Sequence, residues 1–303
     1  MQELELFFKH SDRFLSGKKD KVELALCNLL AQGHTLIEDL PGVGKTTLVS
    51  FFSEVFDLKM SRTQFTNDLL PSDIIGNQVF NRKSSEFEFH PGPIFGEIFM
   101  ADELNRAPPK TQSALLQAME EKSVTVDSHT YAMEEIFHVI ATQNPKSQIG
   151  TFDLPESQLD RFSMKLELGY PNEENTIKLL KEKAHSSKPI IEQKISKSWL
   201  LQSMKACESI EASDSILSYI YRLVDESRAN SLFMPLSNRA AIDILKASKA
   251  WAWMNGDTHV FPEHIQHLFP WIAGHRLCHP SEGSVSIERE LSNKLLQSVP
   301  VRK

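Results

Sequence analysis

The sequence has few of the features that mark disulfide-stabilised, zinc-binding or membrane proteins. It contains three cysteines in 303 residues, and no two of them form a C-x-x-C pair. Neither a zinc site nor a disulfide framework is indicated, and reduced thiols in the cytoplasm are the simplest interpretation. No stretch approaches the roughly 20 consecutive apolar residues that a membrane-spanning helix needs. The first 15 residues carry early acidic groups and no sustained apolar run, so we expect no secretory signal.

Positive charge is not in excess either. The chain has 33 Lys and Arg against 40 Asp and Glu, which gives a net charge of −7. The molecule as a whole is therefore not attracted to nucleic acid or to anionic membrane, and no nucleic-acid partner is expected. Hydrophobic residues make up 41% of the chain, as in ordinary globular proteins, and the length fits a core domain with a smaller second domain.

The first half of the chain alternates short apolar runs with amphipathic stretches. Apolar runs at residues 34–39, 97–103 and 137–144 predict buried strands, and the alternating residues 163–170 are a candidate fourth. Residues 45–56 and 108–121 have helical spacing, and residues 77–90 and 123–133 each resemble a hairpin around a polar turn. Buried strands separated by helices indicate an α/β fold with a parallel sheet covered on both faces.

The strand signals stop near Pro171. Beyond that point, residues 214–229, 237–256 and 262–274 have helical periodicity, and Ile216, Ile220 and Leu223 fall on one face of the first of these segments. We therefore expect an α/β domain over residues 1–170 and an all-helical domain over residues 171–303.

A glycine-rich turn, EDLPGVGKTT, occupies residues 38–47. Gly44, Lys45 and Thr46 match the end of the P-loop pattern G-x-x-x-x-G-K-[ST], but Asp39 stands where the pattern has its first glycine. Glycines allow backbone N–H groups to converge on a phosphate, and the following helix N-terminus adds partial positive charge. Lys45 would reach the outer phosphates, and the Thr46 hydroxyl would bind Mg²⁺. The alternative is a tight strand-to-helix turn with a solvated lysine.

Polar residues end the next two predicted strands. Asp102 and Glu103 follow four apolar residues, at the edge where open α/β sheets bind ligands. Asp102 would orient water on Mg²⁺ and Glu103 would polarise the attacking water; the alternative is that acidic residues simply end a strand. Asn144 ends the third strand, where an amide can hydrogen-bond water or the γ-phosphate. Alternatively, Asn144 and the following proline form a turn.

These residues, in this order, resemble the AAA+ ATPases, and more closely the MoxR family. The resemblance covers about residues 15 to 280 and includes the strings RTQFTNDLLPSDIIG, FEFHPGPIF, MADELNRAPPKTQSALLQAMEE, VIATQNP and LPESQLDRF. It implies a P-loop NTPase core with a parallel sheet flanked by helices, followed by a C-terminal all-helical lid. The two hairpins match insertions that this group carries.

The resemblance also implies residue roles. It places the following residues around the nucleotide: Leu15, Gly17, Gly42, Val43, Gly44, Lys45, Thr46 and Thr47. Thr46 and Asp102 become the Mg²⁺ ligands, and Glu103 becomes the catalytic base. Asn144 matches sensor 1, Arg161 matches an arginine finger directed at a neighbouring subunit, and Arg239 matches sensor 2 on the lid. The lid departs from the family pattern at MPLSNRA, which contains Pro235 and Asn238 where the family usually has a glycine and Ser-Pro. Asn105 and Arg106 receive no firm role.

The function implied is Mg²⁺-dependent ATP hydrolysis at the subunit interfaces of a hexameric ring. Such an enzyme would act as a chaperone-like remodeller of a protein complex, with a separate von Willebrand factor A domain protein as partner. The alternatives are a nucleic-acid-dependent motor or initiator and a nucleotide-dependent scaffold that hardly hydrolyses ATP. Histidines 264, 267, 275 and 279 with Cys278 would suit a metal, although an ordinary amphipathic helix explains the first two.

Overall fold

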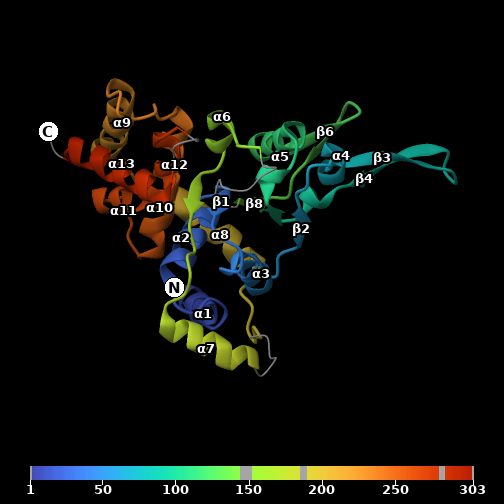
Figure 1. Ribbon diagram of the computed structural model, residues 1–303, viewed down its shortest axis with the longest axis horizontal. Helices are drawn as coiled ribbons and strands as arrows, with labels where there is room; N and C mark the ends of the chain where they lie inside the picture. Colours follow the sequence, from blue (N-terminus) through green and yellow to red (C-terminus); the bar gives the residue numbers. More distant parts are fainter. Residues whose placement is uncertain (1, 144–151, 185–189, 280–283, 302–303) are drawn as a thin grey trace.

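A five-stranded parallel sheet forms the centre of the protein (Figure 1). The computed structural model describes residues 2–143, 152–184, 190–279 and 284–301. The strands lie in the order β2-β5-β8-β1-β9. Their bounds are β1 (Thr35–Glu38), β2 (Met60–Gln64), β5 (Ile98–Asp102), β8 (His138–Gln143) and β9 (Met164–Leu166). The expected α/β class and the four expected strands are confirmed, and β2 is an additional edge strand that the sequence pattern does not indicate.

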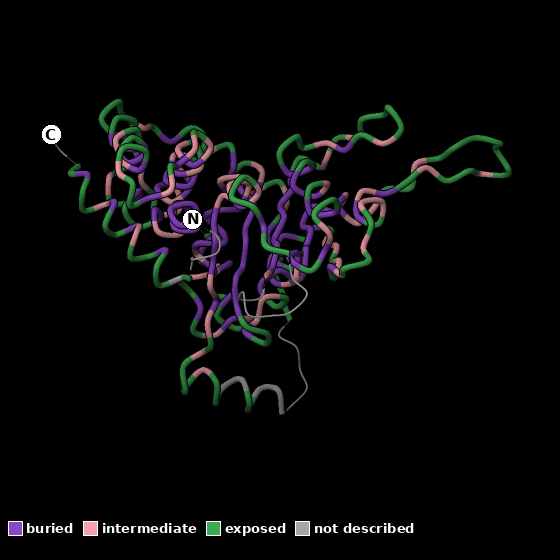
Figure 2. Tube along the Cα trace, turned by 45° about the horizontal axis from the view of Figure 1, so that its top comes forward, coloured by how far each residue is buried: buried purple, intermediate pink, exposed green. Residues whose placement is uncertain are grey.

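Both faces of the sheet are buried, as the apolar runs predict. Along β5, Ile98 and Met100 join one hydrophobic cluster, while Phe99 and Ala101 join another on the opposite face. The first cluster includes side chains of α1 (Gln2–Phe14), α2 (Lys19–Leu30) and α3 (Lys45–Phe56). The second cluster includes side chains of α4 (Pro71–Ile75) and α5 (Pro109–Glu121). Figure 2 shows the sheet as a buried layer.

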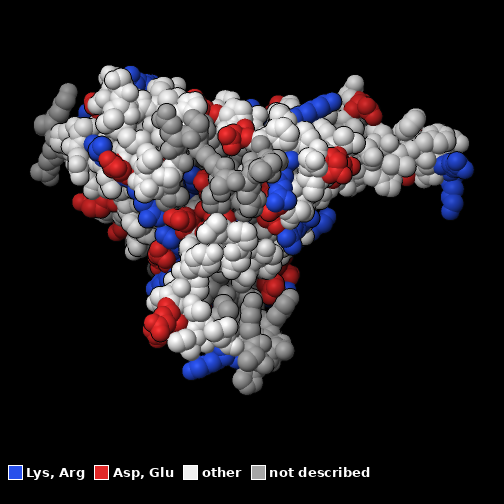
Figure 3. All heavy atoms as spheres, in the orientation of Figure 1, with Lys and Arg blue, Asp and Glu red and all other residues white. Residues whose placement is uncertain are grey.

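Both expected hairpins are present. The first consists of β3 (Gly76–Asn81) and β4 (Glu86–Pro91), and the second of β6 (Ser123–Val126) and β7 (His129–Ala132). The β3–β4 hairpin projects from the body and is largely exposed (Figures 1 and 2). Basic side chains lie at its tip (Figure 3), where Arg82 and Lys83 join the two strands.

The C-terminal part is helical, as expected. It contains α7 (Glu173–Ala184), α8 (Lys197–Ser209), α9 (Asp214–Ala229), α10 (Asn238–Met254), α11 (Pro262–Ile272), α12 (Gly274–Leu277) and α13 (Val285–Ser298). Helices α8 to α13 share one continuous hydrophobic cluster with α1, α2 and α3. The domain boundary at residue 170 therefore stays a prediction. No helix in the described part of the chain is long and apolar enough to cross a membrane.

Two short helical elements lie at opposite edges of the sheet. The 3₁₀ turn η2 (Leu104–Arg106) links β5 to α5, and α6 (Glu156–Leu159) precedes β9. A further 3₁₀ turn, η1 (Pro93–Phe95), lies between the first hairpin and β5. Because all five strands of the sheet are parallel, η2 lies at the carboxyl-terminal edge of the sheet and α6 lies at the amino-terminal edge.

Candidate active site

The glycine-rich turn joins β1 to α3 at the carboxyl-terminal edge of the sheet. Gly42 and Gly44 have φ of 85° and 102°, in the left-handed region that favours glycine. A Cβ built on Gly42 would meet no other described residue within 4 Å, so the described part of the chain leaves space beside it. Thr46 and Thr47 are exposed in the first turn of α3, while Val43 is buried. The loop therefore presents backbone N–H groups and a helix N-terminus to open space, which fits a phosphate group.

The Lys45 ammonium group bends back over this loop. Its Nζ donates to the backbone oxygens of Asp39, at 2.6 Å, and Leu40, at 3.4 Å. Burial lowers the pKa of Lys45, and the nearby carboxylates of Asp39, Asp102 and Glu103 oppose that shift. The loop lysine and the two strand-end carboxylates thus lie close enough to interact electrostatically.

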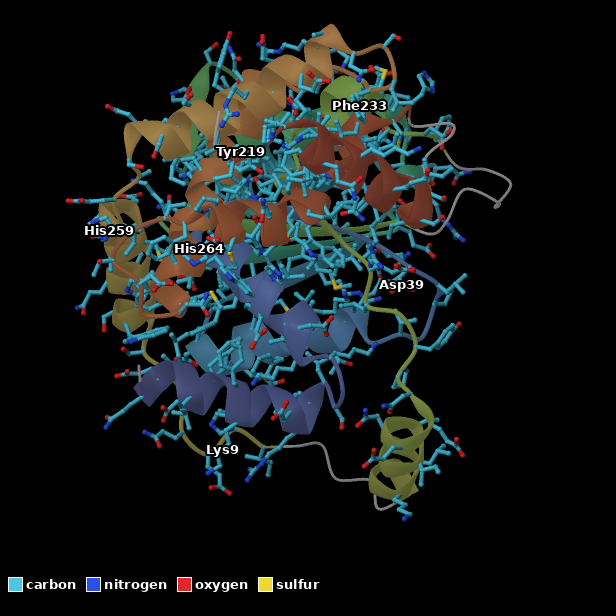
Figure 4. All side chains as sticks on the ribbon, turned by 90° about the vertical axis from the view of Figure 1, so that its left-hand side faces the viewer. Lys9, Asp39, Tyr219, Phe233, His259 and His264 are labelled. Atoms are coloured by element: carbon cyan, nitrogen blue, oxygen red, sulfur yellow. The ribbon has the colours of Figure 1, made fainter. Side chains whose placement is uncertain are left out.

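Asp39, which replaces the first P-loop glycine, holds the loop through hydrogen bonds of its carboxylate. Its carboxylate accepts hydrogen bonds from the backbone N–H groups of Leu40, at 2.9 Å, and Gly169, at 2.7 Å. The buried Lys18 ammonium donates to the backbone oxygens of Val43 and Gly169. Figure 4 shows Asp39 beside the segment that runs from β9 to α7. Asp39, where the chain departs from the P-loop pattern, therefore anchors the loop to the segment that follows β9.

The Asp102 carboxylate ends β5 and is held on both oxygens. Thr142 at the end of β8 donates its hydroxyl to Oδ1 at 2.6 Å, and Arg62 on β2 pairs with Oδ2 at 2.6 Å. Asp102 is buried, and its charge lies close enough to Lys45 to raise the pKa of that lysine against the lowering effect of burial. A carboxylate in this place, together with the Thr46 hydroxyl, is the hard oxygen set that Mg²⁺ prefers. These two residues fit a metal that arrives with the nucleotide.

Glu103 follows β5 with φ of 56°, and its backbone N–H donates to the Thr142 hydroxyl at 2.9 Å. The side-chain oxygen Oε2 receives the amide of Gln64 at 2.7 Å and lies 3.0 Å from Nε of Arg106. The expected strand through residue 103 is therefore one residue too long, because the chain turns at Glu103. Gln64, Arg62 and Thr142 hold the two carboxylates in place and were not among the predicted site residues.

The expected sensor 1 residue, Asn144, lies outside the described residues. The residue before it, Gln143, donates its amide to Glu38 Oε2 at 2.8 Å, just before the glycine-rich loop. Glu38 also pairs with Lys165 on β9 at 2.6 Å. The ends of β8 and β1 are therefore joined by side chains beside the loop.

Leu15 and Gly17, which the resemblance places around the nucleotide, belong to a segment that lies against the same loop. A Cβ on Gly44 would lie 3.6 Å from Cδ2 of Leu15, which is buried. Gly17 has φ of 75°, and a Cβ there would overlap Asn175 of α7. Ser16 donates its hydroxyl to Asn175 at 2.6 Å. The turn between α1 and α2 thus meets the glycine-rich loop and the start of α7.

Arg161 and Arg239 lie together, away from the glycine-rich loop. Arg161 Nη2 lies 3.0 Å from Glu120 Oε2, and Arg239 Nη2 donates to the other oxygen, Oε1. Arg239 also donates to Asp160 Oδ2 at 3.4 Å. Arg276 pairs with Asp160 Oδ1 at 2.8 Å. One acidic and basic cluster therefore joins α5, α6 and the helical C-terminal part.

The strand register shows at which edge of the sheet this cluster lies. Met164 is level with Thr35, at the amino-terminal end of β1, and Arg161 comes three residues before Met164. Asp39 comes four residues after Thr35, so about 13 Å of strand separates the level of Met164 from the glycine-rich loop. Arg161 and Arg239 therefore lie at the edge of the sheet opposite to Lys45, Asp102 and Glu103.

The C-terminal histidines are engaged elsewhere in the fold. His264 Nε2 lies 3.2 Å from Asp257, and His267 stacks on Trp251 with ring centres 4.5 Å apart. His275 is hydrogen-bonded to the backbone oxygen of Phe162 at 3.0 Å. Figure 4 shows His259 and His264 at one side of the molecule, away from Asp39. Among the described residues, no group of three or more His, Cys, Asp and Glu is arranged to hold a metal.

Comparison with known protein families agrees with this geometry. Residues 34–164 match the model of the ATPase family associated with various cellular activities (AAA), and residues 229–294 match an AAA lid domain. The chain is therefore an AAA+ ATPase with a nucleotide-binding core and a lid.

Individual relatives show to which family of AAA+ ATPases the chain belongs. The chain is 34% identical over 275 residues to Chaperone MoxR1 of Mycobacterium tuberculosis, covering 88% of this chain and 73% of the relative. It is 44% identical over 302 residues to the uncharacterised protein YeaC of Bacillus subtilis, covering 97% and 94%. A solved structure of a candidate ATPase from Cytophaga hutchinsonii superposes with a TM-score of 0.89 at 34% identity, covering 100% and 96%. The chain belongs to the MoxR family of AAA+ ATPases.

Proposed function

We propose that this protein hydrolyses Mg²⁺-bound ATP at sites that two adjacent copies of the chain complete together. One copy provides the glycine-rich loop, Lys45, Thr46, Asp102 and Glu103, with Asn144 as the sensor of the γ-phosphate. The neighbouring copy provides Arg161 and Arg239. The observation that carries this proposal is the separation of the two groups to opposite edges of one sheet.

The chemistry of the proposed reaction needs positioning and charge neutralisation more than covalent catalysis. When bound, Mg²⁺ would neutralise charge on the outer phosphates. The backbone N–H groups of the loop and the Lys45 ammonium hold the phosphate chain, and Asp102 holds the metal. Glu103 orients the attacking water and takes up its proton. For that step the Glu103 carboxylate must exchange its contacts with Gln64 and Arg106 for the water.

The arginines supply the remaining charge. In other NTPases an arginine finger raises turnover by about 10³–10⁵, which corresponds to about 4–7 kcal/mol of activation barrier. Arg161 and Arg239 have side chains that are 28% and 35% exposed. Both arginine side chains are therefore partly exposed in the single chain, which supports a contact with a neighbouring nucleotide. A closed ring, which we propose to be a hexamer, gives every site a neighbour.

We further propose a chaperone-like role in the maturation of a protein complex, with a separate von Willebrand factor A domain protein as partner. The name of the relative Chaperone MoxR1 supports the chaperone-like part of this proposal. A nucleic-acid motor is disfavoured by the net charge of −7. A scaffold that hardly hydrolyses ATP is disfavoured by the placement of Glu103 beside Asp102 and Lys45.

The dependence of turnover on assembly tests the proposed function. ATPase turnover per chain should rise with protein concentration and follow ring formation measured by analytical ultracentrifugation. A constant turnover per chain in monomeric protein would overturn the proposal. Capture of bound proteins on the Glu103→Gln variant in ATP then identifies the client.

A further inference from the structure

Glu120 has no role in the mechanism proposed above, although it contacts both arginines. It lies in the last turn of α5, and its side chain is 42% exposed. One carboxylate oxygen pairs with Arg161, which precedes β9, and the other accepts from Arg239 at the start of α10. A single carboxylate therefore bridges an arginine of the core and an arginine of the lid.

The two arginines depend on this carboxylate to different degrees. Arg239 has a second acidic contact, to Asp160, but that contact is long at 3.4 Å. The Nε of Arg161 is buried and has no hydrogen-bond partner among the residues that the structure describes, so within that part of the chain the guanidinium is oriented through its Nη2 contact with Glu120. Two guanidinium groups so close together repel each other, and a shared carboxylate offsets that repulsion.

Arginine side chains have many rotamers, and ordering them costs free energy when they bind a ligand. Two arginine side chains that are already ordered lose less conformational entropy when they bind the triphosphate of a neighbouring copy. The shared carboxylate also links the lid to the core, because Arg239 belongs to α10 and Arg161 to the segment before β9. Displacing one arginine from Glu120 alters the surroundings of the other.

We propose that Glu120 is a positioning residue that holds Arg161 and Arg239 as one unit, directed at the nucleotide of the adjacent copy. This inference rests on the proposed function, because it assigns Glu120 to the arginine side of a site that two copies share. Glu120 acts through the arginines and does not touch the nucleotide bound by its own chain.

The first test separates turnover from binding. Glu120→Ala and the isosteric Glu120→Gln should each lower kcat by about 10²-fold, the cost of a small misplacement of catalytic groups. The affinity for a fluorescent ATP analogue should change less than about twofold, because the glycine-rich loop is unaltered. Glu121→Ala is the matched control, since it removes the same charge from the neighbouring residue, whose carboxylate accepts from Gln117. Wild-type turnover in both Glu120 variants would overturn the proposal.

The second test distinguishes positioning from a structural role. Rings mixed from Glu120→Ala and Lys45→Ala chains should regain activity, because each type of chain supplies the side of the site that the other lacks. Rings mixed from Arg161→Ala and Lys45→Ala chains serve as the reference. If ATPase activity recovers in the reference mixture but not in the Glu120 mixture, the proposed role of Glu120 is refuted and the two-copy site is not. If neither mixture recovers ATPase activity although mixed rings are confirmed, the two-copy site is refuted, and the role of Glu120 is refuted with it.

Discussion

At the scale of single residues, Glu103 is the group whose contacts most directly predict an outcome. Its carboxylate lies beside Gln64 and Arg106 and beside the Asp102 that faces Lys45. Glu103→Gln keeps the side-chain size but removes the proposed base, so ATP binding should persist while kcat falls by about 10²–10⁴-fold. Filter binding and a phosphate-release assay measure the two quantities. Turnover within about twofold of the wild type would remove Glu103 from the role of base.

Two buried histidines give a prediction about pH. Burial lowers the pKa of His34 to about 3 and that of His138 to about 4. In the unfolded chain both imidazoles bind protons near pH 6.5, so folding stability is independent of them above that pH. As the pH falls below 6.5, the unfolded state takes up protons that the folded state does not. Each histidine should then lower the free energy of unfolding by about 2 kcal/mol at about pH 5.

Urea unfolding at several pH values measures this loss. His138→Asn should flatten the decrease between about pH 6.5 and 5, because one proton-linked group is gone. His129→Gln, at an exposed position in the β6–β7 hairpin, should leave the slope unchanged. Equal slopes in the wild type and in His138→Asn would contradict the account of this histidine.

The candidate site residues that belong to a short sequence motif could be predicted from the sequence, and those that depend on distant contacts could not. Lys45 and Thr46 belong to a glycine-rich turn that follows one apolar run, and Asp102 and Glu103 directly follow another. Parallel strands bring such ends to one edge. Glu120 was not predictable as a site residue, because its contacts lie 41 and 119 residues away in the chain (161 − 120 and 239 − 120). Their proximity depends on the packing of α5 against α6 and the lid.

At the scale of secondary-structure elements, the two hairpins pack against each other. Phe89 of β4 stacks on Tyr131 of β7, with ring centres 3.9 Å apart and planes inclined by 16°. Gln78 of β3 donates to the Tyr131 hydroxyl at 3.3 Å. Near the tip, Phe80 and Phe87 contact each other but are exposed. The base of the projecting hairpin is therefore fixed by Tyr131.

This arrangement predicts where the hairpin loosens. Tyr131→Ala should increase the rate of trypsin cleavage at the exposed Arg82 and Lys83 several-fold, because aromatic stacking at the base is lost. Phe87→Ala, which removes an exposed ring from the same hairpin, should change that rate less. Gel analysis of limited proteolysis measures both. Identical cleavage of Tyr131→Ala and the wild type would show that the stack does not restrain the hairpin.

Elements with strong periodicity were predictable, and β2 was not. Helix α3 occupies the expected residues, α5 begins one residue later than expected, and the two strands of each hairpin lie on either side of its polar turn. Strand β2, MSRTQ, has Arg62 and Gln64 among its five residues and lies at an edge of the sheet. It lacks an apolar run because its polar side chains face the site, where they bind Asp102 and Glu103. Because these side chains contact the two carboxylates, the strand lacks the apolar pattern by which a strand is predicted.

At the scale of the whole molecule, a buried ion triad connects the lid to the core. Lys165 of β9 pairs with Glu38 of β1 and Glu288 of α13, both at 2.6 Å. Burial opposes the charge of Lys165, but the two carboxylates raise its pKa above the ordinary value. Lys165→Met leaves two buried carboxylates without their cation and should lower the free energy of unfolding by about 3–5 kcal/mol.

Chemical denaturation of matched variants checks this value. Lys294→Met removes a lysine from an exposed pair with Glu290 on α13, and should cost less than about 1 kcal/mol. Adding Glu288→Gln to Lys165→Met should recover part of the stability, since one unpaired charge is removed. A loss in Lys165→Met as small as that in Lys294→Met would show that the triad does not hold the lid.

The whole-molecule claim is that two copies of the chain complete each ATP site, and mixed rings test it most directly. A chain with both Arg161→Ala and Arg239→Ala keeps its own glycine-rich loop, while Lys45→Ala keeps both arginines. Each variant alone should be nearly inactive, and rings containing both should regain ATPase activity at the mixed interfaces. Absence of any recovery in rings shown by native mass spectrometry to contain both chains would contradict the account.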